Sequence, residues 1–333
     1  MKRRDVVVAP LALAGARLAP AQVAGRIYRV GYLGFAANKT PNDFRIWVGF
    51  VQRLRELGYN EGGNLVIEER YAEGRFERYA EFAAEMIKLK ADVVVATSGN
   101  SAFAVMRLSR SMPIVTTFTP ADPVRAGLVA SLARPGGQLT GLTTLGVELV
   151  AKHLELLQAA LPSVTRIAYA WCPRCAQDSG YSAAEVVALL GERTAAARSV
   201  GVTLVPLDVN AATDFDAASA MLLRERAGAL VIGSTPIAFA LREKWHTFAE
   251  QHRLPTIAES SGMGTMFSYG SDVAAIYRRA AEIVAKILGG ATPAEIPMEQ
   301  PTRFTFTIDM KWAKAKGLTI PQGVLLRADE VIQ

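Results

Sequence analysis

The 333-residue chain contains only two cysteines and three histidines, and it lacks any long uninterrupted apolar run. No apolar stretch approaches the roughly 18 residues that a membrane-spanning helix needs. The two cysteines cannot supply four cysteine ligands for zinc, and His246 and His252 are six residues apart rather than the four of a helical metal pair. We therefore expect no metal site, and packed or solvated roles for these histidines and for His153.

Sequence motifs of several enzyme classes are also missing. No G-x-G-x-x-G follows an expected strand, and neither G-x-x-x-x-G-K-[ST] nor G-x-S-x-G occurs. The chain therefore lacks the glycine-rich phosphate cradles of dinucleotide and P-loop enzymes and the nucleophile elbow of hydrolases. We expect no catalytic residue and no cofactor.

The formal net charge of +6 does not indicate a nucleic-acid partner. Residues 1–21 contain four basic residues and one acidic residue, so they account for +3 and leave about +3 for the rest of the chain. The remaining basic residues are scattered, which is typical of a solvated surface.

The N-terminus has the pattern of an export signal. Lys2, Arg3 and Arg4 form a positively charged segment, residues 6–16 form an apolar segment, and small residues at 19–21 suit a signal peptidase. We predict a signal peptide over residues 1–21 and an exported, periplasmic protein. The pair Arg3-Arg4 leaves both the general secretory and the twin-arginine routes open.

The rest of the chain predicts an α/β protein of about two domains. Half of all residues are hydrophobic and a fifth are charged, as in packed globular proteins. From residue 26 onward, short apolar runs alternate with amphipathic stretches, which is the pattern of βαβ units around a parallel sheet. We expect strands at 28–34, 64–71, 92–97, 114–117, 166–171, 203–209, 229–233 and 254–258, and helices at 43–57, 75–90, from about 101, 122–132, 146–160, 182–199, 214–226, 237–252 and 273–287.

Three further extended segments, 138–144, 264–270 and 303–308, are interpreted as links between two lobes. The predicted fold is therefore two parallel-sheet α/β lobes joined by a three-segment hinge. Lobe 1 is expected to comprise residues 26–143 and 265–300, lobe 2 residues 144–264, and residues 301–333 to cross the hinge. Two lobes joined in this way are suited to closing over a ligand.

The sharpest local motif is Cys172-Pro173-Arg174-Cys175. A C-x-x-C motif is compatible with a redox pair, half of a zinc site or a disulfide. In an exported protein we favour a local disulfide between Cys172 and Cys175, with two free thiols as the alternative.

Several longer motifs together resemble one protein family. They are RLRELGY at 53–59, GNLVIE at 63–68, YAEG at 71–74, DPVRAGLVASLARPGG at 122–137, TGL at 140–142, LVAK at 149–152, SYG at 268–270, and AKAKGLTIP and LLRADEVI between 313 and 332. In these the chain resembles the substrate-binding proteins of ABC transporters that are related to bacterial tryptophan- and tyrosine-binding lipoproteins.

The resemblance implies a type I periplasmic binding fold, an ABC permease and its ATPase as partners, and no catalysis. We also expect a monomer. The resemblance also implies ligand-facing loops after the strands. The chain departs from the family in three of them: at Phe35, where small hydroxyl residues are usual, at the cysteine loop, and at residues 259–262, where the loop is shorter than usual. The loop residues carried over are Phe35, Ser98, Gly99, Asn100, Thr119, Ala121, Asp122, Trp171, Cys172, Arg174, Ser234, Thr235 and Glu259.

Some of these residues also have purely structural interpretations. Asp122 precedes Pro123 and is suited to cap a helix, as well as to contact a ligand ammonium group. Phe35 and Trp171 suit a core as well as stacking on an aromatic ligand. Arg174 is compatible with a solvated surface as well as with a bidentate carboxylate contact.

Our hypothesis is an exported solute-binding protein that captures a small organic ligand between two lobes and delivers it to an ABC importer. The expected ligand carries a carboxylate and is amino-acid-like or aromatic. One alternative is a two-domain α/β enzyme, either glycosyltransferase-like or a thiol oxidoreductase that uses Cys172 and Cys175. Another is a sensory domain that reports a ligand to a partner.

Overall fold

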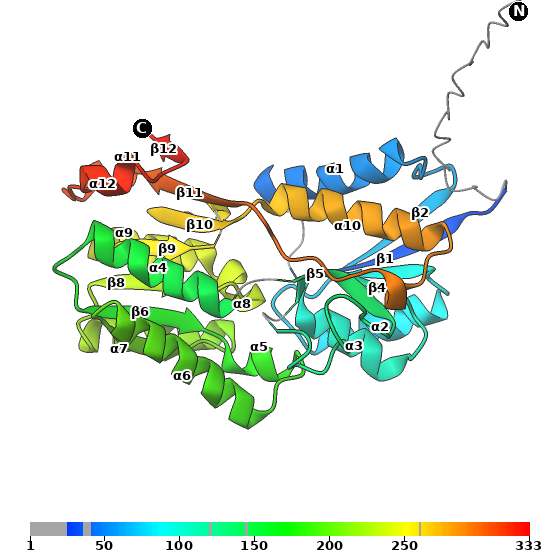
Figure 1. Ribbon diagram of the computed structural model, residues 1–333, viewed down its shortest axis with the longest axis horizontal. Helices are drawn as coiled ribbons and strands as arrows, with labels where there is room; N and C mark the ends of the chain where they lie inside the picture. The colour runs from blue at the N-terminus through cyan, green and yellow to red at the C-terminus, as the bar shows by residue number, and fades with distance from the viewer. Residues whose placement is uncertain (1–24, 36–40, 120–121, 144–145, 260) are drawn as a thin grey trace, which may run out of the picture.

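The computed structural model describes residues 25–35, 41–119, 122–143, 146–259 and 261–333. Within these ranges the chain forms two α/β lobes that lie next to each other (Figure 1). The expected signal peptide at 1–21 lies outside the described residues. None of the helices within the described ranges has both the length and the apolarity that crossing a bilayer requires.

The first lobe is built on five parallel strands in the order β2-β1-β3-β4-β5. Its central strand consists of three valines and an alanine that are fully buried, as expected for a parallel strand covered on both faces. The strands are β1 (Tyr28–Gly34), β2 (Leu65–Tyr71), β3 (Val93–Ala96), β4 (Ile114–Thr119) and β5 (Leu139–Thr143).

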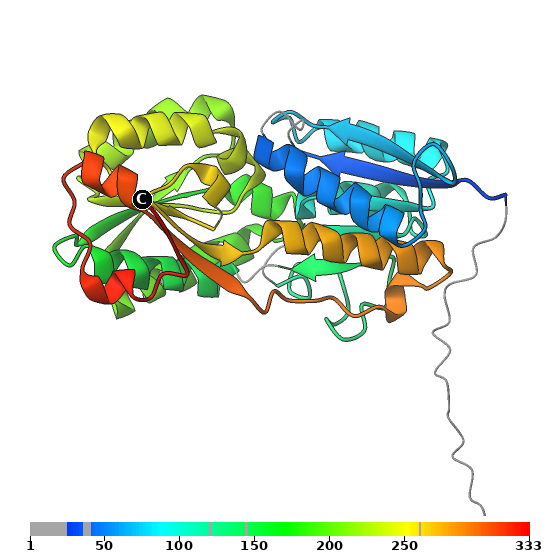
Figure 2. The same ribbon diagram turned by 90° about the horizontal axis from the view of Figure 1, so that it is seen from above.

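Two pairs of helices cover the faces of this sheet. Helix α1 (Pro41–Glu56) packs against α10 (Val273–Leu288) on one face, as Figure 2 shows. Helix α2 (Arg78–Lys88) packs against α3 (Gly99–Leu108) on the other. Because α10 comes from late in the sequence and its Ile283 shares a core with Phe50 of α1, the first lobe is complete only after the chain has returned from the second.

The second lobe is built on seven strands in the order β12-β11-β10-β9-β8-β6-β7. Strands β10 and β11 are antiparallel, and all other neighbours in this sheet are parallel. The strands are β6 (Arg166–Trp171), β7 (Thr203–Asp208), β8 (Ala229–Ile232), β9 (Thr256–Ala258), β10 (Phe267–Ser271), β11 (Phe304–Asp309) and β12 (Glu330–Ile332).

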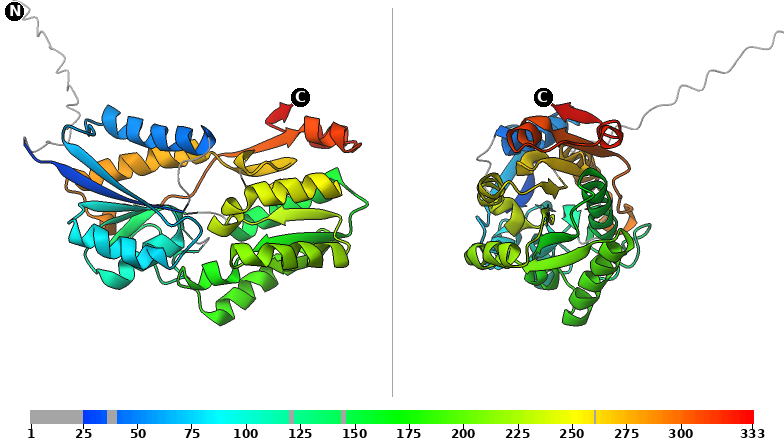
Figure 3. Two further views of the ribbon diagram at one scale, coloured as in Figure 1. Left: turned by 180° about the vertical axis from the view of Figure 1, so that it is seen from behind. Right: turned by 90° about the vertical axis from the view of Figure 1, so that its left-hand side faces the viewer.

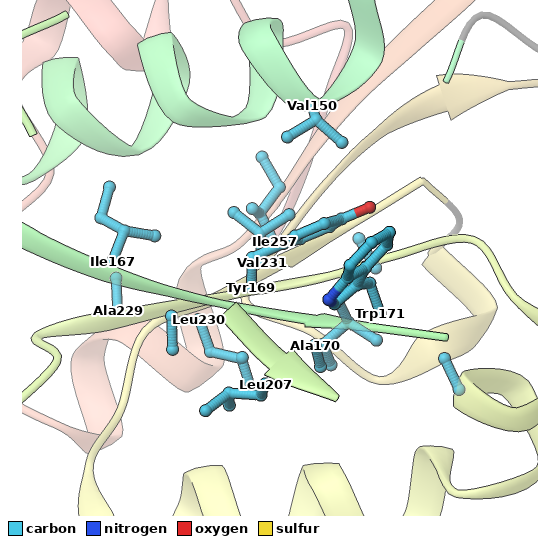
Figure 4. Packing of buried hydrophobic residues seen from close by; sticks show 14 of the residues in the cluster. Val150, Ile167, Tyr169, Ala170, Trp171, Leu207, Ala229, Leu230, Val231 and Ile257 are labelled. Atoms are coloured by element: carbon cyan, nitrogen blue, oxygen red, sulfur yellow. The ribbon is translucent and has the colours of Figure 1, made fainter. Parts of the chain in front are cut away.

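Helices cover both faces of this second sheet. Helices α4 (Gly146–Ala160) and α6 (Ala183–Ser199) pack together on one face. Figure 4 shows Tyr169 and Trp171 of β6 on that side with Val150 of α4, and Leu207 on the opposite side. The remaining helices are α5 (Pro173–Gln177), α7 (Phe215–Arg224), α8 (Pro236–Ala240), α9 (Arg242–His252), α11 (Met310–Ala315) and α12 (Gln322–Leu325), with 3-10 turns η1 (Ala212–Asp214), η2 (Ser261–Met263) and η3 (Pro293–Glu295).

The fold class predicted from the sequence, two mostly parallel α/β lobes, is confirmed, but the expected lobe boundaries need correction. The segments at 264–270 and 303–308 are not free links, because β10 and β11 are paired within the second sheet. Phe267 pairs with Ile257 of β9, so residues from 267 onward still belong to the second lobe until α10 begins. The segment after β11 also lies on the second lobe, as the red ribbon in Figure 3 shows.

The helix expected over 122–132 does not form. Asp122 accepts hydrogen bonds from the backbone N–H groups of Val124 (3.0 Å) and Arg125 (2.8 Å), as a helix cap would. Only turns follow, because Gly127 adopts a positive φ of 68° that ends the first turn. The chain beyond it follows bends, and the adjacent residues Leu128 and Val129 pack into the cores of different lobes.

Candidate functional site

A cavity of about 350 Å³ lies between the two lobes, and residues that follow β1, β3, β6, β8 and β9 line it. In α/β sheets the carboxyl ends of parallel strands form the crevice where ligands bind. The volume is in the range of pockets that enclose small organic molecules. Contributions from both lobes mean that a bound molecule would be contacted from two sides.

Aromatic rings form much of the cavity wall. In the first lobe the rings of Tyr32 and Trp47 pack edge to face, with their centroids 4.5 Å apart. In the second lobe Tyr169 and Trp171 are stacked at 6.2 Å (Figure 4). The indole N–H of Trp171 is already donated to Asp208 at 2.8 Å, which fixes the orientation of the ring. These rings favour a ligand with an aromatic or apolar body.

The start of α3 is stabilised by its own side chains. The hydroxyl of Ser98 accepts a hydrogen bond from the backbone N–H of Ser101 at 3.2 Å, and the Ser101 hydroxyl accepts one from the N–H of Ser98 at 3.1 Å. This reciprocal capping satisfies backbone donors at the helix end. Thr235 similarly caps α8. Ser98 and Thr235 both line the cavity, but their hydroxyl groups already accept hydrogen bonds from backbone N–H groups of the helices that they cap.

Asn100 connects the two lobes beside the cavity. Its side-chain amide donates to the carbonyl oxygen of Cys175 at 3.3 Å and accepts from the hydroxyl of Ser179 at 3.2 Å. Both partners belong to α5 and the residues after it, where a disulfide joins Cys172 to Cys175. The cysteine loop therefore forms part of the contact between lobes as well as part of the cavity wall.

Arg193 of α6 carries a guanidinium into the cavity and is only 8% exposed. One nitrogen donates to the carbonyl oxygen of Leu189 in the same helix at 2.8 Å. The guanidinium carbon lies 5.8 Å from the centre of the Tyr169 ring. Its Nε has no hydrogen-bond partner, and no carboxylate in the described part of the chain forms an ion pair with it. A buried cation without an anion destabilises a protein by several kcal/mol, so this position is suited to an anion from outside the chain.

His153 of α4 is 3% exposed and also lines the cavity. Its Nε2 lies 2.7 Å from the carbonyl oxygen of Tyr269. Burial lowers the pKa of His153 to about 4, so the ring is neutral near pH 7. Its Nδ1 is buried and has no partner among the described residues. A buried polar atom left in this state costs about 1–3 kcal/mol.

Glu259, directly after β9, is the third ionisable group at the cavity. The hydroxyl of Ser234 donates to its Oε2, whereas its Oε1 is buried without a partner in the described ranges. Burial raises the pKa of the Glu259 carboxyl. Gly270 allows β10 to pass close by, because a Cβ at this position would lie 1.8 Å from the carbonyl oxygen of Glu259. Arg193, His153 and Glu259 thus all line one cavity, and each has a buried polar atom without a partner in the described ranges.

The structure brings most of the sequence-predicted ligand residues together. Phe35 lines the cavity, and its ring packs against that of Phe76, with the two centroids 5.2 Å apart. The side chain of Thr119, and Ala121 as a whole, lie outside the described residues. The residues that line the cavity as predicted are Phe35, Ser98, Gly99, Asn100, Trp171, Cys172, Ser234, Thr235 and Glu259.

Two predicted residues do not line the cavity. Asp122 is exposed and uses its carboxylate to cap the turn that follows it. The Arg174 side chain is 68% exposed and forms an ion pair with Asp178 at 3.6 Å. The structural interpretation of Asp122 and the solvated interpretation of Arg174 are therefore the ones that the structure supports.

Sequence reasoning missed the residues that helices contribute to the cavity. His153 and Arg193 lie in the middle of predicted helices, where a polar side chain is normally solvated. The only sequence signal is that both have many apolar neighbours in their helices. Other lining residues that were not predicted are Tyr32, Trp47, Tyr169, Tyr181, Phe239, Met263 and Tyr277.

Comparison with known proteins gives one family and one curated relative. The sequence profile of a family described as ABC transporter substrate binding protein matches residues 39–332. A tyrosine-binding protein of Clostridioides difficile (strain R20291) is 25% identical over 261 residues, which cover 75% of this chain and 70% of the relative.

Solved structures share the whole two-lobe arrangement. One is an ABC domain from Streptococcus pneumoniae in complex with L-Trp, with a TM-score of 0.81 and 21% identity. Another is a conserved domain protein from Vibrio cholerae, with a TM-score of 0.80 and 27% identity. Each match covers 92% of this chain and 100% of the other. At these TM-scores the similarity extends over both lobes.

Proposed function

This chain belongs to the family of ABC transporter substrate-binding proteins, and on that premise we propose that it binds an aromatic, amino-acid-like carboxylate between its lobes. We further propose that it is exported and delivers this ligand to an ABC permease and its ATPase, acting as a monomer. No reaction is part of this function.

The observation that carries the proposal is the buried guanidinium of Arg193. In the described part of the chain it has no carboxylate partner, yet it lines the cavity. A guanidinium forms charge-assisted, often bidentate hydrogen bonds with a carboxylate. A ligand carboxylate at Arg193 would therefore supply the missing anion and relieve the cost of burying the charge.

The cavity wall and the curated relative support an aromatic ligand. Tyr32, Trp47, Tyr169 and Trp171 line the same cavity as Arg193, and the Tyr169 ring lies 5.8 Å from its guanidinium carbon. The relative from Clostridioides difficile is a tyrosine-binding protein, and tyrosine combines an aromatic ring with a carboxylate. Glu259 lines the same cavity and provides an acceptor for an ammonium group.

Ligand capture would act by stabilising one arrangement of the lobes. A ligand that contacts Tyr32 of the first lobe and Arg193 of the second binds the closed form more strongly than an open one. Two lobes that are joined by hinge segments of the chain are suited to such a closing movement. The closed form is then the state that the permease would recognise.

A thermal-shift comparison of matched ligand pairs tests this proposal. We expect L-tyrosine, L-phenylalanine or L-tryptophan to raise the melting temperature, because a ligand at 100 times its Kd adds about 2.7 kcal/mol of stability. The corresponding amines tyramine, phenethylamine and tryptamine lack the carboxylate and should have little effect. No shift with any aromatic carboxylate, or equal shifts with acids and amines, would reject the proposal.

The enzyme alternatives have less support. The chain belongs to a substrate-binding family rather than to an enzymatic one. Cys172 and Cys175 are 2% and 5% exposed and form a disulfide, whereas a catalytic thiol needs an accessible thiolate.

A further inference from the structure

Residues 122–128 belong to the first lobe by sequence but contact the second. They lie between β4 and β5, which are neighbours in the first sheet. Leu128 nevertheless packs into the core of the second lobe, whereas Val129 directly after it packs into that of the first. Because the chain before and after this segment lies in the first lobe, the segment leaves the second lobe when the lobes separate. We call residues 122–128 the strap.

Polar contacts also hold the strap on the second lobe. The hydroxyl of Tyr181 donates to the backbone carbonyl oxygen of Asp122 at 3.1 Å and accepts from the N–H of the same residue at 3.2 Å. Arg125 forms an ion pair with Glu192 of α6 at 2.9 Å, and its Nε lies 3.8 Å from Glu185 of the same helix. Tyr181 also lines the cavity, so the strap adjoins the cavity wall.

Gly180 of the second lobe allows the backbone of the strap to approach. It has a φ of 107°, a conformation that residues with a side chain rarely adopt. A Cβ at this position would lie 2.5 Å from the carbonyl oxygen of Ala126 in the strap and 3.6 Å from a ring carbon of Phe103 in α3. A backbone oxygen cannot rotate aside as the end of a long side chain can. A side chain at position 180 would therefore push the strap, and with it the first lobe, away from the second.

We propose that the strap stabilises the ligand-bound, closed form, with Gly180 as the position that admits its backbone and Arg125 as its charged contact. The inference rests on the proposed function, in which a ligand brings the lobes together. Neither Gly180 nor Arg125 is among the described residues that line the cavity. Both therefore act on ligand affinity through the equilibrium between open and closed forms, and not by touching the ligand.

A pair of glycine variants tests the role of Gly180. Gly201 follows α6 in the same lobe and also has a positive φ, of 80°, but a Cβ there would meet open space. Gly180→Ala and Gly201→Ala therefore both introduce backbone strain, whereas only the first meets the strap. In titration calorimetry Gly180→Ala should bind L-tyrosine about tenfold more weakly than the wild type, and Gly201→Ala should bind it as the wild type does. Equal affinities of the two variants would overturn the inference while the proposed function stands.

A pair of arginine variants tests the charged contact and covers the case in which Gly180→Ala does not fold. Arg166 pairs with Glu225 within the second lobe and serves as the control. Arg125→Gln should weaken L-tyrosine binding about two- to fivefold at low salt, as expected for a partly exposed ion pair, and Arg166→Gln should not. The effect of Arg125→Gln should shrink at about 0.5 M salt because such pairs are screened. Equal affinities of Arg125→Gln and Arg166→Gln at low salt would contradict the role of Arg125.

X-ray scattering of the ligand-free proteins separates a failure of this inference from a failure of the proposed function. Gly180→Ala should have a larger radius of gyration than Gly201→Ala, because its strap no longer lies against the second lobe. If no aromatic carboxylate binds the wild type, the proposed function fails and this comparison alone decides the role of the strap. Equal radii of the two variants would then overturn the inference as well.

Discussion

Asn100 of the first lobe donates a hydrogen bond to the carbonyl oxygen of Cys175 in the second, over 3.3 Å. It also accepts one from Ser179, over 3.2 Å. Next to this contact the hydroxyl of Tyr181 meets the main chain of Asp122, again across the lobes. The cavity is therefore bordered by hydrogen bonds that exist only while the lobes are together, and their loss should favour an open form.

Removing the Asn100 side chain is predicted to weaken ligand binding through the lobe equilibrium. Asn100→Ala deletes two hydrogen bonds, each with a net value of about 1 kcal/mol. The expected loss of affinity is about 5- to 30-fold, with an increase in the radius of gyration of the ligand-free protein in X-ray scattering. Ser179→Ala removes one of the same bonds from the opposite lobe and should show a smaller change in the same direction. Weaker binding without any change in scattering would contradict this mechanism.

Asp122 is predicted to act only as a cap. Its Oδ1 accepts from the N–H groups of Val124 and Arg125, and asparagine caps as well as aspartate does. Asp122→Asn should therefore leave both ligand affinity and stability unchanged, whereas Asp122→Ala should cost about 1 kcal/mol of stability. Denaturant unfolding and calorimetry on the two variants distinguish the roles. A selective loss of affinity in Asp122→Asn would show that the charge contacts the ligand.

His153 is predicted to make stability depend on pH. Its pKa in the folded protein is about 4, below the ordinary value of 6.5, so between these values the unfolded chain binds a proton and the folded chain does not. Stability is therefore highest above pH 6.5 and falls as the pH is lowered towards 4, by about 1.4 kcal/mol per pH unit and by roughly 3 kcal/mol in total. Urea unfolding at several pH values, compared with His153→Asn, isolates this contribution. Parallel pH profiles of the two proteins would contradict it.

Glu259 should have the opposite pH signature. Burial raises the pKa of its carboxyl in the folded protein. The group therefore contributes most to the stability of the fold at low pH, and this contribution is lost as the pH rises through the folded pKa. Glu259→Gln has nearly the same shape and no charge, so the ligand-free variant should be more stable than the wild type at pH 7. This advantage should disappear below the ordinary pKa of 4.5. A variant that is less stable at pH 7 would show that the hydrogen bond from Ser234 outweighs the cost of burying the charge.

The fold could be predicted from sequence wherever short-range patterns decide it. The apolar run at β1 and the long amphipathic stretch of α10 indicate their elements directly, because one periodicity dominates in each. The stretch after Asp122 failed because its cap and its proline favour a helix, whereas Gly127 and the packing of Leu128 and Val129 into different lobes favour turns. The sheet that β10 and β11 join is decided by their pairing with other strands. A local sequence pattern holds no information about such pairing.

The site could be predicted only where it consists of loops at strand ends. Ser98 and Glu259 follow strands and Trp171 is the last residue of one, and topology places all such strand ends at the same crevice. His153 and Arg193 come from mid-helix positions, which become part of the cavity only because α4 and α6 pack together. A buried polar residue on such a face has the same periodicity as a solvated one, so sequence alone does not separate them.

The most direct test of the account is calorimetric titration of the wild type and of Arg193→Gln with L-tyrosine and with L-tyrosinamide, which lacks the carboxylate. Breaking a buried charge pair on one side costs about 2–5 kcal/mol, so the wild type should bind the acid at least 30-fold more tightly than the amide. Arg193→Gln should lose that preference, while its ligand-free form becomes at least as stable as the wild type, because an unpaired buried charge has been removed. If L-tyrosine binds the wild type and Arg193→Gln with equal affinity, Arg193 does not hold the ligand carboxylate and the account is contradicted.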